Sequence, residues 1–240
     1  MKVKEHYDNH LADFYSWMIG DFEKGKNSFK DFCLSNDIRP DKTGLAIDLG
    51  AGSGIQSIAL GEIGYKVKAV DFNSKLLSEL KDRNEGLPIE SVRDDIRNIK
   101  TIADSPVDLI VCCGDTISHL PTFEQLDKLL SDCYDLLGES CRLILSFRDY
   151  SSALSDTQRF IPVKSDDEKI LTCVIDYFDR KVRVTDLLHE RIDGEWIQKV
   201  SSYDKLRLET DDVIERAEKV GFTVSKSESV SRMVYLILVK

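Results

Sequence analysis

Three glycines at alternate positions, Gly50, Gly52 and Gly54, constrain the fold of this chain more than any other feature. They follow a short apolar run at residues 45–49, and residues 55–59 after them carry apolar side chains at helical spacing. This order predicts a strand, a tight turn and the start of a helix. Glycine permits positive φ and a close approach of the backbone to a ligand, and a helix start directs unpaired N–H groups toward it. The segment therefore predicts a turn that binds a nucleotide-like ligand.

The spacing of the glycines distinguishes between two such ligands. A dinucleotide-binding turn needs its third glycine three residues after the second, and Ile55 holds that position. The third glycine here is Gly54, and an acid, Asp48, precedes the turn. This pattern resembles the first motif of class I S-adenosylmethionine-dependent methyltransferases. The resemblance implies that the cofactor is S-adenosyl-L-methionine, held by Asp48, Gly50, Ala51, Gly52 and Gly54. A tight turn with no ligand is the alternative interpretation.

A second acid lies where a ribose would bind. Asp71 ends an apolar strand about 20 residues after the glycine turn begins, and an acid at that place in a βαβ unit accepts the ribose hydroxyls. The next residue, Phe72, belongs to the cofactor site by the same resemblance. The alternative for Asp71 is an N-terminal acid of the helix that begins near Ser74.

A third acid follows the third predicted strand. The segment from Ser91 to Ile96 resembles the part of the family that meets the adenine amino group. Asp95 fits the spacing better than Asp94, because Ile96 and Ile99 then match the family's apolar positions. We therefore expect Asp95 and Ile96 at the adenine, with a solvated loop as the alternative.

The composition indicates a globular protein. A chain of 240 residues, 42% of them apolar, suits one α/β domain with a substantial core. The formal net charge of −10 disfavours a nucleic-acid partner, which would require a basic face. The first residues lead into polar side chains, so we expect no signal peptide. No apolar run approaches about 18 residues, so we expect no contact with a membrane through a spanning helix.

Cysteine usage favours a cytoplasmic location and argues against a metal. The six cysteines are Cys33, Cys112, Cys113, Cys133, Cys141 and Cys173. They form no C-x-x-C pair, and several lie in apolar runs, as expected of buried free thiols in a reducing compartment. A zinc site would need tighter clustering with histidines.

Apolar periodicity predicts alternating strands and helices after an N-terminal helical region. Residues 5–35 are rich in aromatics, including Tyr7, and predict one or two helices. The predicted strands lie near 44–49, 66–71, 89–93, 107–113 and 141–147, and the predicted helices near 54–63, 74–85 and 123–137. Repeated βα units predict an α/β fold with a Rossmann-like, mostly parallel sheet, helices on both faces and ligands at the carboxyl ends of the strands.

The pattern changes after residue 150. Long strands are predicted at 169–178, 181–191 and 196–208, with hairpin signals between them. We read an antiparallel β meander inserted after the fifth strand, then a last helix at 211–220 and final strands at 222–228 and 232–239. The meander has too little core to fold alone. We therefore expect one methyltransferase domain over residues 1–240. It would comprise an N-terminal helical cover (1–40), a cofactor-binding core (41–150), the meander lining the substrate side (151–209) and the last helix and strands (210–240).

Three segments narrow the resemblance. Cys112–Pro121, Leu145–Tyr150 and Tyr203–Leu208 are similar, in order, to segments of glycine N-methyltransferase and related small-amine methyltransferases. The likeness implies S-adenosylmethionine-dependent methylation of a small, carboxylate-bearing molecule at nitrogen. It also implies that Cys113, and Tyr15 and Trp17 of the aromatic N-terminal helix, lie at the cofactor. Enzymes of this family are often oligomers, so a homo-oligomer is an open expectation.

The substrate residues follow from the same resemblance. Arg148 occupies the place of the family's carboxylate-binding arginine, and a guanidinium matches a carboxylate with two parallel bonds. His119 and Tyr150 match a histidine and a tyrosine of the family. Asp115 replaces an asparagine and Phe147 replaces a histidine, and these departures put the identity of the substrate in doubt. The alternatives are a surface Arg148 paired with Asp149 and a His119 that only packs the turn.

The expected chemistry requires positioning more than acid–base catalysis. The sulfonium methyl is already activated, so the protein must hold a nucleophile in line with it and exclude water. An amine must lose its proton to attack, and Asp115 and His119 are the candidate acceptors. An oxygen, sulfur or metalloid acceptor, and a non-catalytic protein that binds the cofactor, are the alternatives, because a fold does not fix the chemistry. A nicotinamide oxidoreductase is disfavoured by Ile55.

Overall fold

A computed structural model of the chain describes residues 5–6, 10–103, 106–230 and 232–240. Its centre is a seven-stranded sheet in the order β10-β11-β5-β4-β1-β2-β3. These strands are β1 (Leu45–Leu49), β2 (Lys66–Asp71), β3 (Ile89–Arg93), β4 (Val107–Cys112), β5 (Leu137–Phe147), β10 (Thr223–Val230) and β11 (Met233–Val239). β1 to β5 pair in parallel, whereas β11 pairs antiparallel with both β5 and β10. The expected Rossmann-like, mostly parallel sheet is confirmed.

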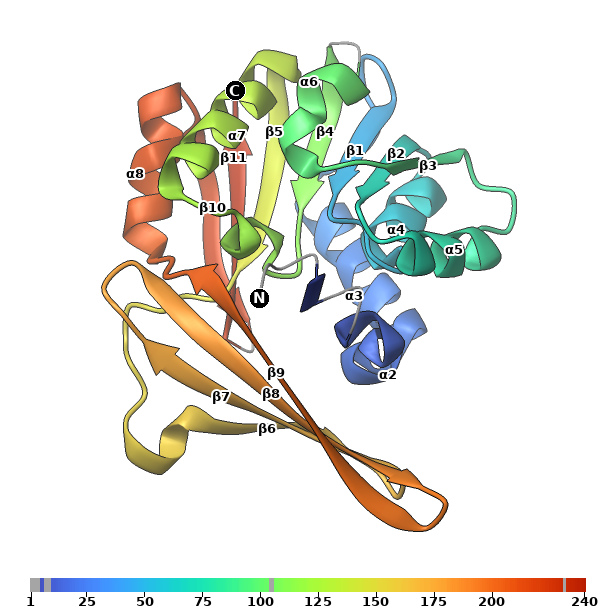
Figure 1. Cartoon of the computed structure of the whole chain (residues 1–240). Coiled ribbons are helices and arrows are strands. Elements are labelled where there is room, and N and C mark those ends of the chain that lie inside the picture. Colours follow the sequence, from blue (N-terminus) through green and yellow to red (C-terminus); the bar gives the residue numbers. More distant parts are fainter. Residues whose placement is uncertain (1–4, 7–9, 104–105, 231) are drawn as a thin grey trace.

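Helices cover both faces of this sheet (Figure 1). The helices of the central region are α3 (Phe22–Ser35), α4 (Ile55–Ile63), α5 (Ser74–Arg83), α6 (Ile99–Ile102), α7 (Phe123–Leu136) and α8 (Thr210–Val220). Side chains alternate across each strand, so Ile47 and Ile110 join the core beneath α7 and α8, while Ala46 and Leu109 join the core beneath α3 and α4. The alternation accounts for two buried layers, one on each side of the sheet. None of the helices among the described residues is long and apolar enough to cross a membrane.

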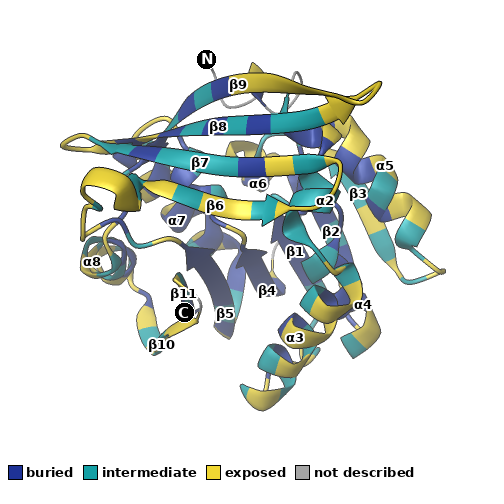
Figure 2. Cartoon of the chain, turned by 90° about the horizontal axis from the view of Figure 1, so that it is seen from below, coloured by how far each residue is buried: buried dark blue, intermediate teal, exposed yellow. Residues whose placement is uncertain are grey.

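The meander forms a second, four-stranded antiparallel sheet in the order β6-β7-β8-β9. Its strands are β6 (Phe160–Ser165), β7 (Lys169–Tyr177), β8 (Lys181–Ile192) and β9 (Glu195–Leu206). Seen from below, this sheet lies across the ends of the buried strands β4 and β5 (Figure 2). Leu206 and Leu208 join the main core, so the meander closes the edge where the parallel strands end.

The N-terminal region contacts both sheets. Its described elements before α3 are a 3₁₀ turn, η1 (Leu11–Asp13), and a short helix, α2 (Tyr15–Ile19), while Tyr7 lies outside the described residues. The His6 ring is fully buried under the meander, where Nε2 lies 3.1 Å from Oδ2 of Asp186 and Nδ1 lies 2.7 Å from Oγ of Ser201. The ring also stacks on Tyr203, with centroids 4.1 Å apart. This segment therefore anchors to the inner face of the meander.

Three local expectations differ from the structure. The fifth strand begins at Leu137 rather than near residue 141, because α7 runs directly into it. A fourth meander strand, β6, precedes the three expected ones. The chain also forms 3₁₀ turns at η2 (Ile96–Asn98), η3 (Thr116–His119) and η4 (Asp156–Arg159), and the short helix α6, none of which was expected.

Candidate functional site

One cavity of about 920 Å³ lies at the carboxyl ends of the parallel strands, bounded on the far side by the meander. Its lining includes eight of the candidate residues, Tyr15, Gly50, Gly52, Asp71, Phe72, Asp95, Ile96 and His119. The ends of β8 and β9 contribute Lys181 and Lys205. Open α/β sheets bind ligands in this crevice, where the strand order reverses between β1 and β4. The structure thus brings three separate sequence motifs to one cavity.

The glycine turn is fixed by packing as well as by backbone conformation. Gly50 has φ +78°, and a Cβ there would lie 2.5 Å from the Thr116 side chain of η3. Gly54 has φ +98°, and a Cβ there would lie 2.7 Å from Leu80 of α5. Only glycine meets both demands. The turn can therefore lie close beneath the cavity.

Asp71 links the end of β2 to the glycine turn. Its Oδ2 accepts the Gly52 N–H at 2.9 Å, and its Oδ1 accepts the Asn73 N–H at 2.8 Å. Burial raises the pKa of this carboxyl, and the hydrogen bonds from Asn73 and Gly52 oppose the rise. A carboxylate oxygen accepts more than one hydrogen bond, so Asp71 can still accept the hydroxyls of a diol in the cavity.

Asp48 lies behind the turn and not on the cavity. Its Oδ2 accepts the hydroxyl of Ser57 in α4 at 2.6 Å. Burial raises the pKa of Asp48 to about 7, and the Ser57 bond opposes this. Ala51 and Gly54 of the same turn also lie outside the cavity lining. These residues shape the turn, whereas Gly50 and Gly52 face the cavity.

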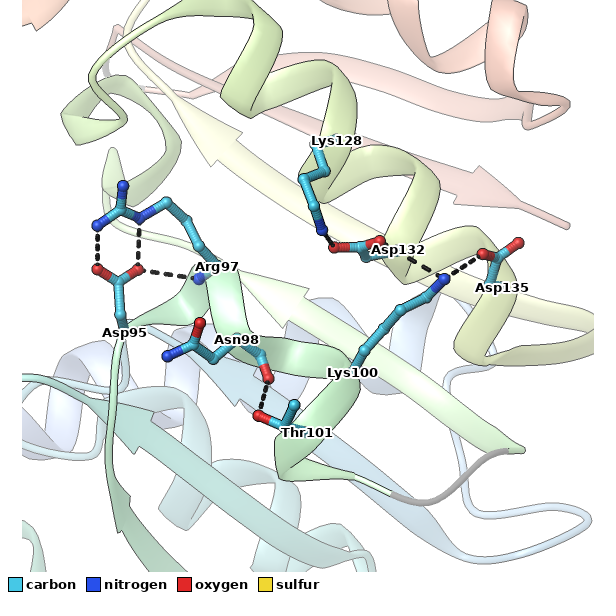
Figure 3. A network of polar contacts seen from close by, with 8 residues as sticks. All are labelled: Asp95, Arg97, Asn98, Lys100, Thr101, Lys128, Asp132 and Asp135. Atoms are coloured by element: carbon cyan, nitrogen blue, oxygen red, sulfur yellow. Dashed lines mark hydrogen bonds and ion pairs between the residues drawn. The ribbon is translucent and has the colours of Figure 1, made fainter.

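Asp95 faces the cavity while it holds a charged partner (Figure 3). The Arg97 guanidinium donates to both of its oxygens, at 2.9 and 2.6 Å, and the Arg97 backbone N–H donates to Oδ1. Asp94 also lines the cavity and accepts the side-chain amide of Asn98 at 2.7 Å. Both acids of the pair are therefore at the cavity, and Ile96 adds an apolar side chain to its lining.

The two aromatic residues of α2 have different surroundings. The Tyr15 ring lies over the glycine turn, 3.6 Å from where a Cβ of Gly52 would be. Trp17 lies outside the cavity lining, packs beside Leu171 and Leu188 of the meander, and hydrogen-bonds to Asp166 through its indole N–H. Tyr15 can thus cover a ligand on the turn, and Trp17 joins α2 to the meander.

Asp115 follows β4 and is buried in an ion pair that crosses from the core to the meander. Its Oδ2 lies 2.8 Å from Nζ of Lys205 in β9, and its Oδ1 accepts the Arg148 backbone N–H at 3.0 Å. The Tyr150 hydroxyl lies 3.5 Å from the same Oδ2. Burial opposes ionisation of Asp115, but the positive charge of Lys205, together with His119 and the hydrogen bonds from Lys205 and Arg148, outweighs it and lowers the pKa of this carboxyl. Asp115 is therefore an ionised, fully engaged carboxylate.

His119 lies on the cavity at the end of η3, stacked on Tyr203 with ring centroids 5.6 Å apart. Burial and the nearby positive charge of Lys205 lower its pKa to about 3. The imidazole is thus neutral near pH 7. A neutral imidazole can accept a proton or a hydrogen bond.

The remaining candidates lie around Asp115. Arg148 is exposed, lies outside the cavity lining and forms no ion pair with Asp149 or with any other described residue. Burial raises the pKa of the Tyr150 phenol, and the charges of Lys205 and Arg148 oppose this, so both cations lie near that ring. Cys113 is buried directly before Gly114 and also lies outside the lining. Clusters of three or more metal-ligating side chains are not found in the described part of the chain.

Sequence reasoning missed Lys205, although a signal for it existed. Strand alternation puts Ser201, Tyr203 and Lys205 on one face of β9, and this is the buried face of the strand. A lysine in such a row is a buried charge that requires a partner. The sequence alone does not show that the partner is Asp115, because the two residues are far apart in the chain.

Comparison with known proteins defines the class. Residues 46–140 match a family model described as a methyltransferase domain. An S-adenosylmethionine-dependent methyltransferase from Clostridium acetobutylicum has the same fold, with a TM-score of 0.74 and 19% identity over 97% of this chain and 95% of that chain. A SAM-bound amino pentose methyltransferase from Micromonospora echinaspora gives a TM-score of 0.73 at 12% identity, over 96% of this chain and 97% of that chain. Residues 46–140 thus match a methyltransferase domain, and the chain has the fold of S-adenosylmethionine-dependent methyltransferases, whose cofactor is S-adenosylmethionine.

Curated relatives give a finer likeness in sequence. The glycine/sarcosine N-methyltransferase of Halorhodospira halochloris is 26% identical over 152 residues, which are 62% of this chain and 56% of that protein. The glycine/sarcosine N-methyltransferase of Aphanothece halophytica is 29% identical over 113 residues, which are 46% of this chain and 42% of that protein. The matches span about half the length of these curated relatives.

Proposed function

We propose that the protein transfers a methyl group from S-adenosylmethionine to the nitrogen of a small, carboxylate-bearing molecule. The observation that carries the proposal is the single cavity of about 920 Å³, which joins the glycine turn and Asp71 to the polar groups at the ends of β4 and β9. This volume is near the upper end for a small-molecule site, so it can take a cofactor with a small acceptor beside it. The names of the two glycine/sarcosine N-methyltransferases support nitrogen as the acceptor atom.

The cavity has the groups that an adenosyl compound needs. Asp71 would accept the ribose hydroxyls, Phe72 and Ile96 would pack on the adenine, and Asp95 would accept its amino group. Gly50 and Gly52 let the methionine part approach the backbone, and Tyr15 would cover it. The shape of the glycine turn would depend on Asp48, Ala51 and Gly54, and the conformation at the end of β4 on Cys113. Trp17 would fix the position of α2.

The reaction requires that the chain position the acceptor amine and that this amine lose one proton. Bound S-adenosylmethionine supplies a methyl group on a sulfonium, which needs no further activation. His119 is a neutral imidazole on the cavity and can accept a hydrogen bond from the attacking amine, but its pKa of about 3 makes it a weak base, so the amine would give its proton to solvent. Asp115 is less suited to accept that hydrogen bond, because Lys205 and the Arg148 N–H engage its oxygens. Arg148 is exposed outside the lining, so it would contribute positive charge that attracts an anionic acceptor rather than a direct contact, with Tyr150 near it.

The proposal includes the organisation and location of the protein. The meander and the core would act as one methyltransferase domain, because Leu206 and Leu208 of the meander side complete the main core. All six cysteines are free thiols, which supports a reducing, cytoplasmic compartment.

Radiolabelled S-adenosylmethionine with a panel of acceptors tests the proposal. We expect label transfer to glycine or sarcosine, and little transfer to phenols, thiols or arsenite. Transfer only to an oxygen, sulfur or metalloid acceptor would replace the nitrogen assignment. Tight calorimetric binding of S-adenosylmethionine without transfer to any acceptor would show a non-catalytic protein, and no binding by folded protein would contradict the whole proposal.

A further inference from the structure

The ion pair between Lys205 and Asp115 joins the two sheets of the molecule inside the cavity region. The side chains are 9% and 4% exposed, and Nζ and Oδ2 lie 2.8 Å apart. Asp115 lies just after β4 with φ +73°, a conformation that few residues other than glycine adopt. Lys205 is near the end of β9, paired with Val182 of β8. The turn after β4 and the end of β9, which are far apart in the sequence, thus bring these two charges into contact.

Stability alone does not account for this pair. Removing a lysine and an aspartate from water costs more than their attraction returns in many proteins, and apolar side chains often hold the same space as well or better. Val182 and Leu206, beside Lys205, are buried apolar residues of this kind. Both members of the pair are charged: burial opposes the charge of Lys205, but Asp115 together with Tyr203 and Tyr150 outweighs it and holds the pKa of the ammonium above its usual range. Charges retained at such a cost commonly lie in functional sites.

Lys205 lies on the cavity. Gly50, Thr116 and His119 also line it, and the Thr116 side chain packs against Gly50 at the start of the glycine turn. An ammonium has three N–H donors, and within the described residues Lys205 gives one of them to Asp115 and none to another acceptor. The Tyr203 ring lies on another side of Nζ, 5.5 Å from it. The remaining donors can therefore serve a ligand.

We propose that Lys205 is a specificity-determining residue, whose ammonium binds the carboxylate of the methyl acceptor while Asp115 positions it. This inference rests on the proposed function of the same cavity. Arg148 is exposed and lies outside the lining. Lys181 and Lys205 both line the cavity from the meander, and of these two only Lys205 is buried. Its position would set the carboxylate of an amino acid so that the amine lies toward His119.

The test compares acceptors with and without the carboxylate. Glycine and glycinamide, and sarcosine and its amide, are assayed for turnover and for binding to protein saturated with S-adenosylhomocysteine. We expect Lys205→Met to raise the KM and Kd for glycine or sarcosine by about 10–100-fold, the range of one charge-assisted hydrogen bond. We expect the affinity for S-adenosylhomocysteine to change less than about threefold, and the preference for acid over amide to disappear.

Matched variants separate this role from a structural one. Lys205→Arg keeps a cation and should restore much of the preference for the acid, which a packing role would not require. Lys199→Met removes a lysine of the same strand that pairs with Glu190 outside the cavity, and should leave the preference unchanged. If Lys205→Met does not fold, the Asp115→Asn, Lys205→Met double variant leaves no unpaired buried charge and should show the same loss of preference.

The outcomes distinguish the inference from the function on which it rests. Wild-type protein that methylates glycine, with Lys205→Met retaining the wild-type preference for the acid, would overturn the inference alone. Wild-type protein that binds glycine through Lys205 but methylates no amine would overturn the proposed function alone. Wild-type protein that binds neither glycine nor sarcosine more tightly than the amides would overturn the inference.

Discussion

The Asp71 carboxylate and the Gly52 backbone N–H are joined by a hydrogen bond of 2.9 Å between Oδ2 and N. The bond connects the end of β2 to the glycine turn that follows β1. It therefore fixes the position of these two parts of the candidate cofactor site relative to each other. Asp71 also accepts the Asn73 N–H that precedes α5. A single side chain therefore sets the geometry of the turn and faces the cavity.

Replacing Asp71 should weaken cofactor binding strongly. Asp71→Ala removes the acceptor of two backbone N–H groups and of the expected ribose hydroxyls, so the Kd for S-adenosylhomocysteine should rise by about 10–100-fold. Isothermal titration calorimetry measures this. Asp82→Ala, which removes the same charge from an exposed position of α5, is the control. Equal affinities for Asp71→Ala and the wild type would remove Asp71 from the site.

Gly54→Ala should destabilise the protein more than Gly86→Ala. Both glycines have positive φ, +98° and +84°, but the added methyl of Gly54→Ala would meet Leu80 at 2.7 Å, whereas nothing lies within 4 Å at Gly86. The strain common to both is about 1 kcal/mol, and overpacking adds about 1–3 kcal/mol at Gly54. Urea unfolding of both variants gives the difference. Equal losses would show that the contact with Leu80 relaxes freely.

Loss of His6 should release the N-terminal segment from the meander. His6→Ala leaves the buried Asp186 carboxylate without its imidazole and removes the stacking on Tyr203. Breaking a buried pair costs about 3 kcal/mol, so the Tm should fall by roughly 6–12 °C for a chain of this size. Thermal unfolding measures this, with His189→Ala as the control because that ring lies on a partly exposed strand face. A similar small change in both variants would contradict the anchoring role.

The neutral state of His119 should make the fold sensitive to acid. Its pKa is about 3 in the folded protein, against 6.5 for an unperturbed histidine, so the unfolded chain binds the extra proton between these values. The stabilisation is fully present above pH 6.5 and is lost as the pH falls toward 3, by up to about 1.4 kcal/mol per pH unit. Urea unfolding at pH 7.5 and 5 should therefore show a loss for the wild type about 2 kcal/mol larger than for His119→Gln. Parallel losses would show that the imidazole is protonated in the fold.

Much of the fold could be predicted from periodicity, and the exceptions have local causes. β4 is a largely apolar run and β2 alternates lysine with apolar residues, and the predicted limits agree with the structure to within a residue for β1 to β4. The strand β6 was not predicted, because it contains Pro162, shifts register there and is largely exposed. The first residues of β5 were not predicted as strand, because residues 138–140 are polar or small and Ser140 has φ +62°.

The candidate site was predictable where it lies in one segment of chain. The glycine turn, Asp71 and Asp95 each follow a strand, and parallel strands bring their carboxyl ends to one edge. The pairing of Asp115 with Lys205 depends on how the meander sits on the core. No local pattern determines that placement, so Asp115 looked like a free acid in the sequence.

The place of β11 between β5 and β10 has a consequence for biosynthesis. An interior strand of the sheet is made only after the entire meander and α8 have left the ribosome. Until then β5 carries an open backbone edge, which is a template for pairing with other nascent chains. The contacts that close it span a long stretch of chain and form slowly. Protection of this edge during synthesis, by a chaperone or by early docking of the meander, would thus govern the yield of native protein.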